Sequence, residues 1–100
     1  THQGVLREHR AYVAALAEAG VTVEILPALE AFPDSVFIED PALVFPEGAI
    51  LLRPGAPSRL GEADALAPAL TARFEETQAL DIGFADGGDV INLGDRILIG

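Results

Sequence analysis

The stretch from Phe32 to Asp40 constrains this chain most, because it sets three carboxylates within an apolar run of nine residues. Pro33 and Pro41 mark breaks in regular structure at its two ends. Strands contain few Asp residues, and a partly buried carboxylate costs several kcal/mol unless it is paired. We therefore expect the acids of this strand-like stretch either to face open water or to lie beside a positive charge.

Length and charge narrow the classes of function. The chain has 100 residues, half of them hydrophobic, which suits one small domain with a modest core. Sixteen acidic and six basic residues give a net charge of −10. This charge repels nucleic acids and anionic membrane surfaces, and it favours cationic small molecules or basic partners. The chain has no cysteine, so it holds no disulfide, thiolate metal site or cysteine nucleophile.

The apolar runs and the two ends of the sequence bear on cellular location and on whether the chain is part of a longer protein. No apolar run approaches the length of a membrane span, and the N-terminus lacks the basic-then-apolar order of a signal peptide. We therefore expect a cytoplasmic protein with no membrane partner. The chain opens on a helical pattern and stops in the strand-like run 97–100, so we also expect it to be part of something longer.

Hydrophobic periodicity predicts an α/β fold. An amphipathic helix begins near Val5 and ends at a left-handed Gly20, and a β-branched strand follows at Val21–Leu26. The other expected elements, in order, are a hairpin of 42–45 and 50–53 around a turn at 46–48, a helix capped by Ser58 that runs to about Phe74 and is kinked or shortened at Pro68, a strand at 78–81, and a hairpin of 90–92 and 96–99.

Asp34, Glu39 and Asp40 are candidates for binding a cation. They could equally be ordinary charges of a turn or a sheet edge. As a site, clustered carboxylates match the planar donors of a guanidinium better than a compact ammonium. Calcium is the competing cation, but the loop with an acid at every second position is absent. We therefore expect a guanidinium ligand and no metal or other cofactor.

Arg59 lies at the end of a Pro- and Gly-rich linker, close to the start of the expected helix. The helix macrodipole already makes that end positive, so an arginine there should meet an anion. The anion is either a ligand carboxylate or, as an internal salt bridge, Glu62 or Glu39.

A glycine-rich bend at Asp86–Asp89 brings two carboxylates close, although by itself it is typical of an ordinary turn. His2 and His9 lie far along the chain from every acidic loop. We expect both histidines on the surface rather than in a catalytic role.

Taken together, segments 9–13, 32–40, 53–59 and 86–90 resemble the dimethylarginine dimethylaminohydrolase family, in the superfamily that includes arginine deiminase. The specific motifs are FPDSVFIEDPALV and LLRPGAPSR, whereas DGGD is shared more widely. The resemblance implies a five-bladed α/β propeller of ββαβ modules, with the active site at its centre. Residues 1–100 would form roughly two of these modules, truncated at both ends.

The resemblance also implies a chemistry. A cysteine thiolate attacks the guanidinium carbon, a histidine protonates the leaving amine, and water hydrolyses the thiouronium intermediate to citrulline. Asp34, Glu39 and Asp40 match the family's substrate-binding acids, with Asp40 assigned to the guanidinium. Arg59 matches the arginine that holds the substrate's carboxylate, and Asp86 the acid that contacts both the guanidinium and the catalytic histidine.

The family's cysteine and histidine match no position of this chain, so residues 1–100 alone should be inactive. Two alternatives stay open: an arginine deiminase-like or other guanidine hydrolase, and a non-catalytic acidic module that binds basic ligands. Part of a propeller would expose sheet edges and apolar surface, so we expect self-association or packing against the rest of the protein. If the chain is part of a guanidine hydrolase of either kind, Asp40, Arg59 and Asp86 should line one cleft.

Overall fold

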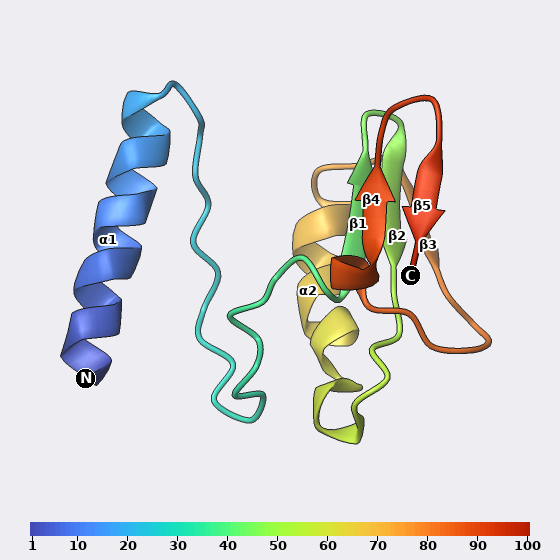
Figure 1. Ribbon diagram of the computed structural model, residues 1–100, viewed down its shortest axis with the longest axis horizontal. Coiled ribbons are helices and arrows are strands. Elements are labelled where there is room, and N and C mark those ends of the chain that lie inside the picture. The colour runs from blue at the N-terminus through green and yellow to red at the C-terminus, as the bar shows by residue number, and fades with distance from the viewer.

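The computed structural model describes residues 1–100 and shows a mixed α/β fold around a three-stranded sheet (Figure 1). Strands β1 (Ala42–Phe45) and β2 (Gly48–Leu51) form an antiparallel hairpin, which confirms the first expected hairpin. Strand β3 (Glu76–Ala79) pairs with β2 in parallel. A parallel pair needs a crossover connection, and helix α2 (Glu62–Thr71) supplies it.

The core lies between α2 and this sheet and is small. Only 11 of the 100 residues are buried, so much of the apolar surface stays exposed. No helix of the structure has the length and the apolar character needed to cross a membrane. The buried hydrophobic residues are Ala42, Ala49, Leu52, Ala63 and Leu66.

Helix α1 (His2–Glu18) stands apart from the sheet and buries none of its side chains (Figure 1). The hydroxyl of Thr1 caps it by accepting a hydrogen bond from the backbone N–H of Gly4 at 3.0 Å. Gly20 follows the helix with a φ of 88°, which confirms the left-handed glycine expected there. The apolar face of the helix is open, since Val5 is 59% exposed.

The strand expected at Val21–Leu26 is absent, and this prediction is wrong. The segment runs from α1 toward the sheet but pairs with no strand, and Ile25 is 63% exposed. β-Branched residues favour a strand only where a neighbouring strand offers backbone hydrogen bonds, and no strand lies beside this segment. One side chain of this segment, Glu24, forms an exposed ion pair with Arg73.

The acidic stretch forms turns, so its description as a strand is also wrong. The N–H of Ser35 bonds the carbonyl of Phe32 at 3.0 Å, and the N–H of Phe37 bonds the carbonyl of Asp34 at 3.0 Å. These local bonds replace the ladder bonds that a strand would make. Asp40 ends the stretch two residues before β1, so the acids precede a strand rather than lie within one.

Helix α2 begins later than the sequence predicts. Residues Pro57–Arg59 form a separate 3-10 turn, η1, and Ser58 does not cap the helix. Pro68 lies inside α2, which ends at Thr71, short of the expected Phe74. The expected strand at 78–81 is likewise displaced toward the N-terminus, since β3 spans 76–79.

A second, two-stranded sheet follows the first. Strands β4 (Val90–Asn92) and β5 (Ile97–Ile99) pair antiparallel, which confirms the second expected hairpin. The glycine-rich bend leads into β4 as a 3-10 turn, η2 (Gly87–Asp89). A backbone bridge between Arg53 and Ala85 holds this bend beside the linker that carries Arg59.

Candidate functional site

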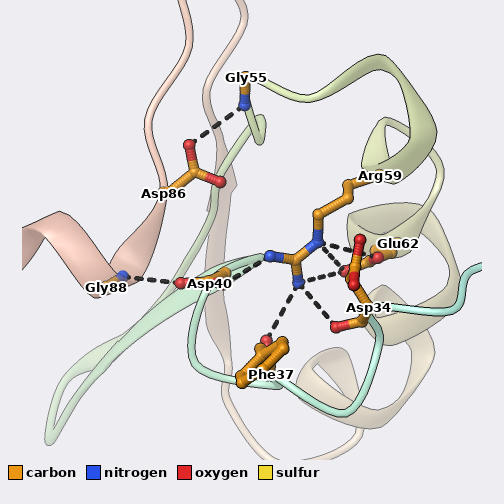
Figure 2. A network of polar contacts seen from close by, with 8 residues as sticks. All are labelled: Asp34, Phe37, Asp40, Gly55, Arg59, Glu62, Asp86 and Gly88. Atoms are coloured by element: carbon orange, nitrogen blue, oxygen red, sulfur yellow. Dashed lines mark hydrogen bonds and ion pairs between the residues drawn. The ribbon is translucent and has the colours of Figure 1, made fainter.

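Arg59 is the centre of a polar network, with its side chain only 9% exposed (Figure 2). Its Nε donates to both carboxylate oxygens of Glu62 at 3.0 and 3.1 Å, and its Nη2 donates to Oε2 of Glu62 at 2.7 Å. On the other side, Nη1 donates to Oδ2 of Asp40 at 2.5 Å. The guanidinium is thus held between two carboxylates.

Backbone carbonyls complete the surroundings of this guanidinium. Nη2 of Arg59 also donates to the carbonyls of Asp34 and Phe37, both at 3.2 Å. These carbonyls converge because residues 32–40 form successive turns rather than an extended strand. The Glu62 carboxylate is placed by local sequence, since Glu62 lies three residues after Arg59 and is the first residue of α2. An acid in the first turn of a helix is also favoured by the macrodipole.

The electrostatics of the cluster favour a cation. Hydrogen bonds to Glu62 and then to Asp40 raise the pKa of Arg59 above its ordinary value, against the opposing effect of burial. Arg59 therefore stays charged at every pH at which proteins are assayed. Its single positive charge faces the two carboxylates of Asp40 and Glu62, so this group has a net negative charge.

Asp40 connects Arg59 to the glycine-rich bend. Its Oδ1 accepts a hydrogen bond from the N–H of Gly88 at 2.9 Å, and its carbonyl accepts one from the N–H of Gly87 at 2.9 Å. Asp86 precedes these glycines and lies near the Arg59 network, but its carboxylate bonds neither Asp40 nor Arg59 (Figure 2). Oδ2 of Asp86 accepts from the N–H of Gly55 at 3.2 Å, whereas its Oδ1 has no hydrogen-bond partner.

The close approach of the two segments explains both glycines of the bend. A Cβ atom at Gly87 would lie 2.0 Å from the carbonyl oxygen of Glu39, and one at Gly88 would lie 2.8 Å from Oδ1 of Asp40. The backbone leaves no room for a side chain at Gly87, whereas at Gly88 the Asp40 side chain would have to move aside. The bend therefore brings its backbone N–H groups to Asp40 because it carries no side chain at these two positions.

The structure brings some of the candidate residues together and leaves others open. Asp40 and Arg59 are in contact, and Asp86 lies on the adjoining bend (Figure 2). Asp34 contributes its carbonyl to the network, while the side chains of Asp34 and Glu39 are exposed and make no hydrogen bond. Of the two internal salt bridges considered for Arg59, the one to Glu62 is present and the one to Glu39 is not.

The two histidines of the chain lie outside this network, and so do two of its cavities. Of the three cavities in the structure, those of about 310 and 220 Å³ are not lined by Asp40, Arg59 or Asp86. His2 and His9 are exposed on α1, as expected. No three His, Asp or Glu side chains are grouped so that they could hold a metal ion.

The sequence did not reveal the backbone groups of the site. The carbonyls of Asp34 and Phe37 and the N–H groups of Gly55 and Gly88 all bind charged side chains of the network. A backbone group has no side-chain signature, and the glycine-rich bend by itself predicted only a turn that brings two carboxylates close. The spacing of Arg59 and Glu62, by contrast, was readable in advance.

Comparison with known proteins identifies the family. No protein-family model matches the chain. The N(G),N(G)-dimethylarginine dimethylaminohydrolase of Pseudomonas aeruginosa is 39% identical over 99 residues, covering 95% of this chain and 38% of the relative. Its counterpart in Streptomyces coelicolor is 41% identical over 109 residues, covering 99% of this chain and 39% of the relative. The chain belongs to the dimethylarginine dimethylaminohydrolase family.

Solved structures of this family share the fold of the chain. A crystal structure of a dimethylarginine dimethylaminohydrolase adduct with 4-chloro-2-hydroxymethylpyridine matches with a TM-score of 0.93 and 36% identity, over 99% of this chain and 41% of that one. A cysteine-to-serine mutant of the Pseudomonas aeruginosa protein, complexed with citrulline, matches with the same TM-score over 40% of its chain. The chain thus spans about 40% of the length of these family members.

Proposed function

We propose that residues 1–100 form the substrate-binding part of a hydrolase that converts N-methylated arginines to citrulline and methylamines. The observation that carries the proposal is the contact between Asp40 and Arg59 beside Asp86. Acids suited to a guanidinium and an arginine suited to a carboxylate therefore lie in one network, which matches the two ends of an arginine-like ligand. The family members complexed with citrulline or joined to S-methyl-L-thiocitrulline support this ligand class.

In this proposal the two ends of the substrate meet different residues. Asp86 receives the guanidinium on its free Oδ1, while its Oδ2 stays bound to Gly55. Asp40 contributes from the other side, although both of its oxygens already accept one hydrogen bond each. Arg59 holds the carboxylate of the substrate. The exposed acids Asp34 and Glu39 add negative charge around the entering cation.

The proposed chemistry uses groups that this chain does not contain. A cysteine thiolate adds to the guanidinium carbon, the methylamine leaves with a proton from a histidine, and water then releases citrulline from the thiouronium intermediate. The carboxylates of this chain orient the guanidinium for that attack. In the same proposal, residues 1–100 are about two modules of a five-bladed propeller, whose other modules cover the open apolar surface seen here.

An assay of citrulline formation tests this function. We compare the purified 100-residue chain with the longer protein, of the length of its relatives, that would contain it (below, the full-length protein). The full-length protein should form citrulline from mono- and dimethylarginine faster than from arginine or agmatine. The isolated chain should form none, because it has no cysteine.

Each other outcome of the assay identifies a different error. Turnover by the isolated chain would overturn the division of roles between this chain and the rest of the protein. Faster hydrolysis of arginine than of methylarginines would indicate an arginine deiminase-like hydrolase. Binding of basic ligands by the full-length protein without any citrulline would indicate a non-catalytic acidic module.

A further inference from the structure

Glu62 is a buried charge to which the family resemblance assigns no role. It is 2% exposed, and both of its oxygens accept hydrogen bonds from Arg59 alone. A buried carboxylate is costly unless it is fully paired, and Arg59 provides that pairing. Glu62 can therefore influence a ligand only through the orientation of Arg59.

In the observed orientation of Arg59, four of its five guanidinium N–H groups have acceptors and one is free. A guanidinium has five N–H groups. In Arg59, the N–H of Nε and one N–H of Nη2 meet Glu62, and the other N–H of Nη2 meets the carbonyls of the turns. One N–H of Nη1 meets Asp40. The second N–H of Nη1, at the corner that Glu62 does not touch, is the one without an acceptor.

We propose that Glu62 is a positioning residue that holds the Nε and Nη2 edge of Arg59, so that the free N–H of Nη1 meets the substrate's carboxylate. This inference rests on the function proposed above, in which Arg59 binds that carboxylate. Arg59 then gives a single charge-assisted hydrogen bond rather than a two-pronged one. Without Glu62, the same edge has no carboxylate acceptor, and only Asp40 and the two backbone carbonyls hold the guanidinium.

The test compares two substrates of the full-length protein that differ only in the carboxylate. One is monomethylarginine and the other is its decarboxylated analogue. In Glu62→Gln, the amide offers one acceptor oxygen in place of two. We expect KM for monomethylarginine to rise about tenfold with little change in kcat. For the decarboxylated analogue we expect neither constant to change, because that substrate has no carboxylate for Arg59 to bind.

The matched control is Glu24→Gln, which makes the same change in the exposed pair with Arg73 and should alter neither substrate. If Glu62→Gln does not fold, Glu62→Asp replaces it: its shorter carboxylate retains the charge but cannot span both Nε and Nη2, so a smaller loss confined to monomethylarginine is expected. An equal loss for both substrates would make Glu62 purely structural and overturn the inference, while the proposed function would stand. If the wild type hydrolyses neither substrate, the proposed function fails and the inference fails with it.

Discussion

Replacing Arg59 by alanine is expected to lower the free energy of unfolding of the full-length protein by about 3–5 kcal/mol. The side chain is 9% exposed and pairs with Glu62, which is 2% exposed. Its removal leaves the Glu62 carboxylate buried without a counter-charge and leaves two backbone carbonyls without their donor. Urea unfolding, with the slope checked for constancy, measures the change.

Two further variants distinguish the effect of losing a buried ion pair from the effect of losing an arginine at any position. Arg73→Ala removes an exposed ion pair to Glu24 and should cost no more than about 1 kcal/mol. The double variant Arg59→Met with Glu62→Leu removes both buried charges and should recover much of the loss, because well-packed apolar residues often replace a buried pair without penalty. Equal costs for Arg59→Ala and Arg73→Ala would contradict the central place given to this network.

Replacing Gly87 by alanine is expected to destabilise the full-length protein by about 1–3 kcal/mol and to abolish most of the hydrolase activity proposed for it. The new Cβ would lie 2.0 Å from the carbonyl oxygen of Glu39, so one backbone segment must move away from the other. That movement breaks the hydrogen bond from the N–H of Gly87 to Asp40 and displaces the neighbouring Asp86. Unfolding and citrulline assays on the same preparation measure both effects.

Gly55→Ala is the matched control for this prediction. A Cβ atom at Gly55 would meet Oδ2 of Asp86 at 3.6 Å, an ordinary van der Waals contact, and the backbone N–H that binds Asp86 is retained. Gly55→Ala should therefore be nearly neutral in both assays. Equal behaviour of the two alanine variants would show that the bend is not closely packed against Glu39 at Gly87.

The sequence predicted the hairpins and helices whose signals are local. The β1–β2 hairpin follows from two apolar runs around Pro46–Gly48, and α1 follows from its apolar periodicity. The prediction of a strand at Val21–Leu26 was wrong because a strand needs a neighbouring strand to pair with. The amino-acid composition of a segment does not show whether such a neighbour is present. The acidic stretch failed for a related reason, since its backbone bonds close turns instead of joining a ladder.

The sequence identified candidate residues of the Arg59 network better than their arrangement. The motifs around Asp40 and Arg59 pointed to both residues, and Glu62 was readable as a partner three positions after Arg59. The direction of the Asp40 side chain was not readable, because the N–H that fixes Oδ1 belongs to Gly88, 48 residues away. The orientation of the Asp40 carboxylate therefore depends on a tertiary contact that no local pattern encodes.

The position of citrulline in a crystal of the full-length protein tests the central claim most directly. The claim is that Asp86 and Asp40 hold one end of the ligand and Arg59 the other. We predict the ureido group within hydrogen-bond distance of Oδ1 of Asp86, and the carboxylate within hydrogen-bond distance of Nη1 of Arg59. Citrulline bound with its carboxylate away from Arg59, or bound at a site that contains none of these three residues, would contradict the account.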